Sequence, residues 1–362
     1  MTDIEDLKYW LALNHVPGIG KVLYKRLIDH FKSPVKVFSS TMKELKSIEG
    51  IGERLAKDIL TADWKEKVDI ELSLIEKEKV KVITLSDELY PENLKRIYDP
   101  PPFLYMKGEL RKEDNRAIAM VGSRKATTYG RLMTERLSKD LVSHGITVVS
   151  GMARGIDTFS HQGALSAGGR TIAVLGCGID IIYPSENRSL RNKIIESGAV
   201  LTEFPFSTPP EGVNFPSRNR IISGLSLGVV IIEATSDSGS LITASNALDQ
   251  GREVFAVPGN ITSKLSQGTN KLIKRGAKLV EDADDIIEEI LPQMERKKKV
   301  KTIPVLTSEE EVIYKLLSDE PKHIDTISRE GRLTSNKALS LLLEMEIKGV
   351  IRQLPGKSFV AE

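Results

Sequence analysis

The stretch that decides the fold is Ala117-Ile118-Ala119-Met120-Val121-Gly122-Ser123-Arg124. Five consecutive apolar residues are typical of a strand that is buried on both faces of a sheet. The turn that follows offers bare backbone N–H groups and a cation just before a helical pattern over residues 127–143. Such a turn suits an anion. One strand, one turn and one helix in this order predict a unit of a parallel sheet.

The same unit recurs between residues 78 and 291. Strands are predicted at 80–84, 117–121, 147–149, 171–175, 200–202, 229–232 and 254–257. Helical patterns separate most of them, for example at 127–143, 157–167, 187–196 and 240–250. This alternation predicts an α/β domain with a doubly wound, mainly parallel sheet, whose ligands bind at the carboxyl ends of the strands.

Residues 1–70 contain an internal repeat. Val16-Pro17-Gly18-Ile19-Gly20 and Ile48-Glu49-Gly50-Ile51-Gly52 stand 32 residues apart, and each precedes a helical pattern. The repeat resembles the helix-hairpin-helix motif (SAM-like), in which the amides of a glycine-rich turn meet a phosphate. The alternative is a small helical bundle that uses these glycines only to turn, since no strongly basic face accompanies the repeat.

A basic run, Arg296-Lys297-Lys298-Lys299-Val300-Lys301, lies in the stretch 292–304, which we interpret as a linker. Contact of this run with phosphates is the alternative. Residues 305–362 then predict three helices and a hairpin around Pro355-Gly356, the order of a winged helix. Ser308 with Glu311 is predicted as the capping box of the first helix.

The predicted winged helix is acidic, with 8 basic and 10 acidic side chains, and Glu344 and Glu346 fall in its candidate recognition helix. Winged helices often bind duplex DNA. Here a protein contact or a packing role competes with that function.

Bulk composition narrows the class of protein. The chain has 362 residues, 40% hydrophobic, with a net charge of +2. No apolar run approaches the roughly 20 residues of a membrane span, and the acidic N-terminus lacks the features of a signal peptide. The single cysteine, Cys177, excludes an intrachain disulfide and fits a reducing compartment. We therefore expect a cytoplasmic protein with no membrane segment, no metal site and no cofactor.

A second informative stretch is Asn214-Phe215-Pro216-Ser217-Arg218-Asn219-Arg220, just before the predicted strand 229–232. Forked guanidinium groups suit phosphate oxygens, and an aromatic ring can stack on an unpaired base. The alternative is a surface loop whose arginines pair with local acids.

Known nucleotide-binding fingerprints are incomplete in this chain. Gly176-Cys177-Gly178 is not a dinucleotide motif, because the position of the third glycine holds Ile181. Gly356-Lys357-Ser358 is not a phosphate loop, because the required upstream glycine position holds Ile351. These gaps argue against NAD chemistry and NTP hydrolysis.

Signals for catalysis are weak. Asp157 and His161 lie four residues apart on one helix, but an Asp near a helix start is usually a cap. Cys177 has no matching base and is expected to be buried. Glu203 and Glu233 end strands, where they could bind a ribose, order arginines or cap helices. We therefore expect no enzyme.

Taken together, the motifs resemble the DNA-processing protein A family (DprA, also called Smf), over nearly the whole chain. The motifs that carry this resemblance are Val121-Gly122-Ser123-Arg124, Ser150-Gly151-x-Ala153-x-Gly155-Ile156-Asp157, Thr171-Ile172-Ala173-Val174-Leu175-Gly176-x-Gly178-Ile179-Asp180, Tyr183-Pro184-x-x-Asn187, Phe215-Pro216-x-Arg218-Asn219-Arg220-Ile221-Ile222, Ser238-Gly239-Ser240-Leu241 and Ala256-Val257-Pro258-Gly259.

The resemblance implies a non-enzymatic protein whose extended Rossmann domain binds single-stranded DNA. It also implies homodimers and loading of the RecA recombinase onto DNA imported in natural transformation. The loop after Pro184 often holds a basic residue in the family and here reads Ser185-Glu186, which departs from that pattern. The alternative is a small-nucleotide-binding enzyme or sensor of a related Rossmann superfamily.

The residues that the resemblance and the anion-binding turns together predict to bind nucleic acid are Gly122, Ser123, Arg124, Gly151, Ala153, Arg154, Gly155, Phe215, Arg218, Asn219, Arg220, Ser238, Gly239 and Ser240.

Overall fold

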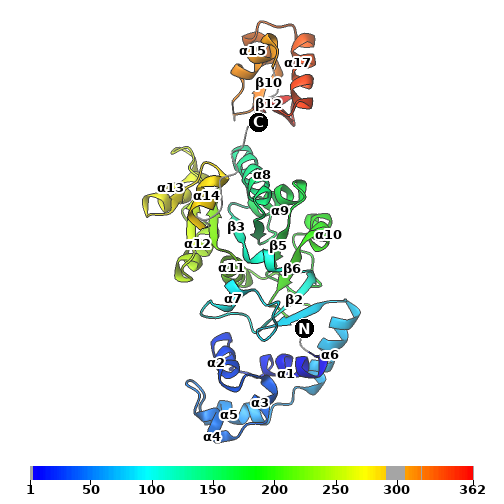
Figure 1. Cartoon of the computed structure of the whole chain (residues 1–362), viewed down its shortest axis with the longest axis vertical. Helices are drawn as coiled ribbons and strands as arrows, with labels where there is room; N and C mark the ends of the chain where they lie inside the picture. Colours follow the sequence, from blue (N-terminus) through cyan, green and yellow to red (C-terminus); the bar gives the residue numbers. More distant parts are fainter. Residues whose placement is uncertain (1–2, 291–305, 319, 362) are drawn as a thin grey trace. The chain divides into compact units, whose positions relative to one another are not determined.

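A computed structural model describes residues 3–290, 306–318 and 320–361. The chain separates near residue 294 into two compact units. The first holds a helical segment and the α/β sheet, and the second holds the C-terminal helices and hairpin (Figure 1). The predicted linker 292–304 lies outside the described residues.

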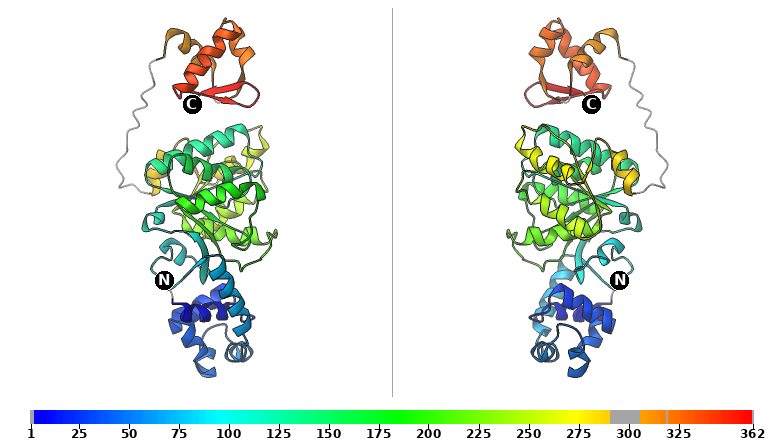
Figure 2. Two further views of the ribbon diagram at one scale, coloured as in Figure 1. Left: turned by 90° about the vertical axis from the view of Figure 1, so that its right-hand side faces the viewer. Right: turned by 90° about the vertical axis from the view of Figure 1, so that its left-hand side faces the viewer.

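Short helices make up the N-terminal segment, which forms a bundle of its own, drawn in dark blue in Figure 2. They are α1 (Ile4–Asn14), α2 (Lys21–Phe31), α3 (Pro34–Phe38), α4 (Met42–Lys46), α5 (Glu53–Leu60) and α6 (Lys65–Lys77). The two predicted turns are confirmed: Gly18 and Gly50 have φ of +89° and +91°, a region that favours glycine. Gly20 and Gly52 then cap α2 and α5.

The α/β part is built on a nine-stranded sheet in the order β1-β2-β6-β5-β4-β3-β7-β8-β9. The strands from β6 through β9 pair in parallel, and β1 and β2 extend the sheet in antiparallel fashion. The strands are β1 (Lys81–Thr84), β2 (Phe103–Gly108), β3 (Ala117–Val121), β4 (Thr147–Ser150), β5 (Thr171–Val174), β6 (Ala199–Thr202), β7 (Gly228–Ile231), β8 (Glu253–Ala256) and β9 (Lys278–Leu279).

Helices cover both faces of this sheet, so the doubly wound prediction is confirmed. The α-helices are α7 (Glu92–Lys95), α8 (Thr128–Ser143), α9 (Ile156–Ser166), α10 (Arg188–Ser197), α11 (Asn214–Leu225), α12 (Ser240–Asp249), α13 (Gln267–Lys274) and α14 (Ala283–Ile290). Short 3-10 turns are η1 (Lys112–Asn115), η2 (Ser185–Asn187) and η3 (Lys264–Ser266). In Figure 1, α8, α9 and α10 lie along one face, and α11 and α12 cover the other.

Alternate residues of β3 belong to two different hydrophobic cores. Ala119 of β3 belongs to the core that contains Ile221 of α11. Its neighbour Ile118 points to the opposite core, which contains Leu137 of α8. Side chains alternate between faces along a strand, so a strand buried on both faces must be apolar throughout. This explains why β3 reads as an unbroken apolar run.

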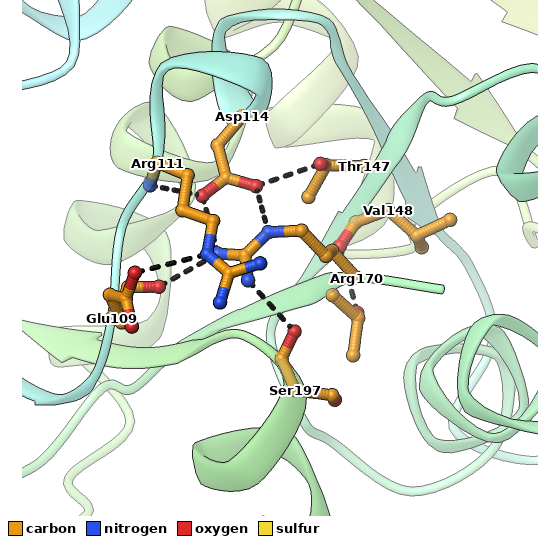
Figure 3. A network of polar contacts seen from close by, with 8 residues as sticks. Glu109, Arg111, Asp114, Thr147, Val148, Arg170 and Ser197 are labelled. Atoms are coloured by element: carbon orange, nitrogen blue, oxygen red, sulfur yellow. Dashed lines mark hydrogen bonds and ion pairs between the residues drawn. The ribbon is translucent and has the colours of Figure 1, made fainter. Parts of the chain in front are cut away.

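A partly buried ion pair joins the amino ends of the central strands (Figure 3). Arg170, just before β5, donates to both carboxylate oxygens of Asp114 at 2.9 and 2.7 Å. Thr147 at the start of β4 donates to the same carboxylate, and Arg170 also reaches the carbonyls of Ser197 and Glu109. Bidentate pairs of this kind fix geometry strongly, so this network holds the sheet at the edge opposite the turns described below.

The sequence patterns did not predict α11. Its first turn contains Pro216, where a missing N–H costs no hydrogen bond. The stretch 214–220 is therefore helical, not a loop, and its side chains alternate between a buried and an open face. Strands β2 and β9 were also missed; β9 has only two residues, both exposed.

The second unit is a winged helix, as predicted. It comprises α15 (Ser308–Leu316), β10 (Lys322–His323), α16 (Ile324–Glu330), α17 (Ser335–Ile347), β11 (Ile351–Leu354) and β12 (Ser358–Ala361). The strands form a sheet in the order β10-β12-β11, with the hairpin drawn in red in Figure 2.

One detail of the winged-helix prediction is wrong. The capping box of α15 is Thr307 with Glu310, not Ser308 with Glu311. Thr307 has the extended backbone of a cap, and its side chain accepts from the amide of Glu310 at 3.3 Å. The helix therefore begins at Ser308.

Within the described ranges, no helix combines the length and the apolar character needed to cross a bilayer.

Candidate nucleic-acid interface

A cavity of about 450 Å³ lies at the carboxyl ends of the parallel strands. Strand order runs β3, β4, β5, β6 in one direction and β7, β8, β9 in the other, so β3 and β7 flank the point where the winding reverses. Open α/β sheets bind ligands at this switch point, because the loops diverge there and leave a crevice. The cavity walls come from the turns after β3, β4 and β7 and from α11 and the start of α12.

Most of the predicted binding residues meet in this cavity. It is lined by Gly122, Ser123, Arg124, Ala153, Phe215, Arg218, Asn219, Ser238, Gly239 and Ser240. A smaller cavity of about 40 Å³ adjoins it and is lined by Gly151 and Arg154, together with Tyr183. Gly155 lines neither, but a Cβ there would lie 2.3 Å from the Ser123 carbonyl oxygen, so the two turns touch through this glycine.

Phe215 stands between the two cavities and lines both. Its ring lies against the backbone of Gly176, where an added Cβ would come within 2.8 Å of the ring. Tyr183 tilts toward it at 5.7 Å between ring centres. The ring is thus held from behind and from one side, and it remains half-buried.

Arg124 is the exposed cation nearest to this ring. Its guanidinium carbon lies 5.2 Å from the centre of Phe215. Lys125, the next residue, is also exposed. A guanidinium over a ring is attracted by the π electrons, and it keeps its N–H groups available for an anion.

Arg218 occupies a different place from the one its motif suggested. Its side chain is 97% buried, and its Nη1 donates to the carbonyl oxygens of Gly151, at 2.8 Å, and Val174. Burial lowers the pKa of Arg218 to about 10, against the opposing effect of Asp157, so the group stays charged at neutral pH. Gly151 is needed for this contact, because a Cβ there would lie 2.4 Å from Nη1.

Arg218 therefore joins the loop after β4 and the carboxyl end of β5 to α11. It is a wall of the cavity and a structural tie, and its hydrogen bonds go to the protein. The contacts of Arg218 thus agree in part with the alternative prediction for the 214–220 stretch, in which its arginines bind nearby protein groups. For Arg218 those groups are carbonyls and not acids.

Arg220 does not line either cavity. Its guanidinium pairs with Glu203, which ends β6, and with Asp99 at 3.1 Å. Lys21, at the start of α2, also reaches Glu203 at 2.8 Å and Ser217 at 3.3 Å. Arg218 and Arg220 are two residues apart, so they point to nearly opposite sides of α11. Arg220 belongs to a buried cluster between the helical segment and the sheet.

The amides of the loop after β4 are partly occupied. Asp157, in the first turn of α9, accepts from the amides of Gly151 and Ala153 at 3.1 and 3.2 Å. Burial raises the pKa of this carboxyl group, although Arg218 and these amides oppose the shift. The predicted anion-binding turn is therefore closed by a carboxylate at two of its N–H groups.

Arg154 in the same loop forms an ion pair with Glu186, and both side chains are largely exposed. Asn219 donates weakly to the carbonyl of Gly239 at 3.4 Å, and Ser238 and Ser240 share a hydrogen bond of 2.8 Å. These last contacts set the turn before α12 against α11.

The residues considered for catalysis have structural partners. His161 bonds to Thr171 at 2.6 Å, not to Asp157, and burial lowers its pKa to about 3. Burial raises the pKa of the Cys177 thiol to about 11, which disfavours the reactive thiolate. Glu233 accepts from the amide of Thr127 at 2.9 Å and from its hydroxyl, so it fixes the start of α8. With Glu203 also paired, the small-nucleotide alternative is not favoured.

Tyr183 is a lining residue that the site prediction omitted. It belongs to the motif Tyr183-Pro184-x-x-Asn187, which is the sequence signal for its position. Asn187 explains its position, because this side chain donates to the carbonyl of Met152 at 3.0 Å and so fixes the segment against the loop after β4.

Comparison with protein families agrees with this architecture. Residues 81–291 match the model of DNA recombination-mediator protein A. Residues 297–357 match the DprA winged helix domain, and residues 11–64 match the SAM-like helix-hairpin-helix tandem.

The chain is also similar to individual proteins. It is 33% identical to Protein Smf of Synechocystis sp. over 97% of this chain and 98% of that protein. It is 44% identical to the DNA processing protein DprA of Bacillus subtilis over 60% of this chain and 74% of that protein.

Two solved structures of DNA processing protein A share the fold. That of Streptococcus pneumoniae is 34% identical, with a TM-score of 0.69, and the match covers 80% of this chain and 98% of that one. That of Helicobacter pylori, described for its single-stranded DNA binding mode, is 29% identical with a TM-score of 0.54, covering 60% and 98%.

Proposed function

We propose, because the chain belongs to the DNA recombination-mediator protein A family, that it binds single-stranded DNA in the cavity between β3 and β7. We also propose that it loads RecA onto that DNA, including strands imported during natural transformation. The proposal includes no bond chemistry by this chain. It places the protein in the cytoplasm, with domains over 1–70, 78–291 and 305–362 and a linker over 292–304.

One observation carries the proposal. Arg124 and Phe215 adjoin at the mouth of the cavity, with a cation 5.2 Å from the centre of a half-buried ring. An unpaired strand presents both phosphates and free base faces, whereas the bases of a duplex are stacked inside. The guanidinium suits the phosphate and the ring suits the base.

The same geometry accounts for weak sequence preference. The ring contacts the face of a base, and every base has such a face. We therefore expect affinity to depend strongly on salt and little on sequence.

A titration of the full chain against single- and double-stranded oligonucleotides of equal length tests the DNA step. We expect tighter binding of the single strand and about tenfold weaker binding by Arg124→Ala, roughly 1.4 kcal/mol. Lys95→Ala, on the short helix α7, removes an exposed cation outside the cavity and serves as the control. Equal affinity of Arg124→Ala and the parent chain would remove the cavity as the binding site.

We also propose a homodimer formed through the α/β part. The edge strand β9 leaves Leu279 44% exposed, and Leu248 of the nearby α12 is 63% exposed. Between α12 and α13 lies an apolar cavity of about 330 Å³. An unpaired edge with exposed leucines is a ready surface for a second chain. Sedimentation of Leu248→Glu and Leu279→Glu tests it: dimers that persist in both would exclude this surface.

RecA loading is tested separately. On single strands covered by a single-strand-binding protein, this chain should shorten the lag of the RecA ATPase. A variant that still binds DNA but leaves the lag unchanged would separate the two steps, and an unchanged lag with the parent chain would exclude loading.

A further inference from the structure

The recognition helix α17 of the winged helix carries an exposed apolar ridge. Leu339 is 52% exposed and Leu343 is 57% exposed, and the two lie four residues apart on one side of the helix. Ser340 between them is also exposed. Other leucines of the same helix, such as Leu342, are fully buried in the core of the unit, so this ridge is additional to what the fold needs.

The charges on α17 fit duplex DNA poorly. The outward arc presents Asn336, Leu339, Ser340, Leu343 and Glu344. Lys337, on the flank of this arc, already pairs with Glu309 of α15 at 2.8 Å. A helix that enters a groove between phosphates needs cations on its flanks. Here two leucines and a carboxylate occupy that arc.

The same arc is complementary to itself. At 3.6 residues per turn, Lys337 and Glu344 lie about two turns apart on one flank, and Leu339 and Leu343 lie on the other. A two-fold axis perpendicular to two antiparallel copies of α17 brings each flank against the same flank of the second copy, with the order reversed. Leu339 then meets Leu343 of the second copy, and Glu344 of the second copy approaches Lys337, which shares its ammonium between that carboxylate and Glu309 of its own chain.

Both pairings share one centre. The midpoint between Leu339 and Leu343, and that between Lys337 and Glu344, fall within one residue of Ser340. A small side chain at that centre lets two helices approach closely. A two-fold symmetric contact requires this reciprocity: if one residue contacts a second residue of the other copy, that second residue contacts the first residue of the other copy.

We infer that α17 is a contact between two copies of this chain, in which the recognition helices pack antiparallel about a two-fold axis near Ser340. The inference rests on α17 alone and does not depend on DNA binding in the α/β part. Between chains already joined elsewhere, such a contact would form at a high effective concentration.

Disulfide trapping in the full-length chain tests the contact. Cys177 is buried, so a Ser340→Cys variant carries one accessible thiol. Cysteines can bridge only when their Cα atoms lie about 4.4–6.8 Å apart. We expect mild oxidation of Ser340→Cys to give severalfold more covalent dimer than Lys315→Cys. Lys315 is 78% exposed on α15 and reports chance collisions.

Second-site changes in the Ser340→Cys background distinguish this geometry from a nonspecific apolar contact. Leu339→Glu with Leu343→Glu should abolish the covalent dimer. Glu344→Lys should also reduce it, because a like charge then faces Lys337 of the second copy while the ion pair of Lys337 with Glu309 stays intact. A cooperative thermal transition shows that each variant is folded. Equal cross-linking of Ser340→Cys and Lys315→Cys, or a dimer that survives the leucine changes, would overturn the inference.

Discussion

The guanidinium of Arg124 and the ring of Phe215 belong to different elements, the turn after β3 and the first turn of α11, and lie 5.2 Å apart from carbon to ring centre. They are 91 residues apart in the sequence, counted from their numbers. Gly176 lies behind the ring, and a side chain at that position would displace it. Cation and ring therefore form one surface only because three loops meet at the switch point of the sheet.

Replacing each partner should have a distinct effect on single-strand binding. Phe215→Ala should cost about 1–3 kcal/mol, the typical value of one stacked base, and should leave the salt dependence unchanged. Arg124→Ala should make the plot of log affinity against log salt concentration less steep, by the amount expected for the loss of about one phosphate contact. Titrations at several salt concentrations measure both quantities. Identical slopes for the parent and Arg124→Ala would show that this cation does not touch phosphate.

Arg218→Ala should act through stability. Removing the buried guanidinium leaves the carbonyl groups of Gly151 and Val174 without their donor and takes away a positive charge that favours ionised Asp157, and such a loss costs about 3–5 kcal/mol. Arg218→Lys should not rescue it, because an ammonium cannot reproduce the planar fork. Denaturant unfolding measures the loss. Arg124→Ala is the matched control, since an exposed arginine should change stability by less than about 0.5 kcal/mol.

Glu186→Gln should tighten single-strand binding. Glu186 holds Arg154 in an exposed ion pair beside the smaller cavity, and a phosphate must compete with that carboxylate. Its removal should raise affinity about two- to fivefold at low salt, the range of an exposed pair, with the gain fading as salt increases. Glu196→Gln, an exposed residue of α10, removes the same charge elsewhere and should have little effect. An equal gain in both variants would point to net charge alone.

His161 should make the α/β unit less stable in mild acid. Its pKa is about 3 in the folded chain, because burial disfavours the cation, and the ordinary value in the unfolded chain is 6.5. Between these values the unfolded state binds the proton and the folded state does not. The free energy of unfolding should therefore fall as pH drops below about 6.5, by up to about 1.4 kcal/mol per pH unit from this group.

Unfolding titrations of the parent and of His161→Gln between pH 4 and 7 measure that slope. The variant should have a shallower dependence on pH, whatever its absolute stability. His30→Gln, at an exposed position on α2, should keep the parent's slope. If the slopes of the parent and of His161→Gln coincide, His161 is not the group that titrates.

Sequence alone determined the organisation of this chain. The unbroken apolar run of β3 predicted a strand buried on both faces, because alternate side chains enter different cores. Glycines at 18 and 50 predicted hairpins, since their backbone conformation penalises other residues. These properties are local or periodic, so they can be read without knowing what packs against what.

Only the tertiary structure decided which side chains face the cavity. The sequence predicts that Arg124, Arg218 and Arg220 all bind nucleic acid, yet the first is exposed, the second binds carbonyl groups, and the third pairs with Glu203. Their partners, such as Gly151, Val174 and Asp99, lie far away in the sequence. The free energy of a charge depends on burial and on its nearest partners, and the order of residues along the chain specifies neither.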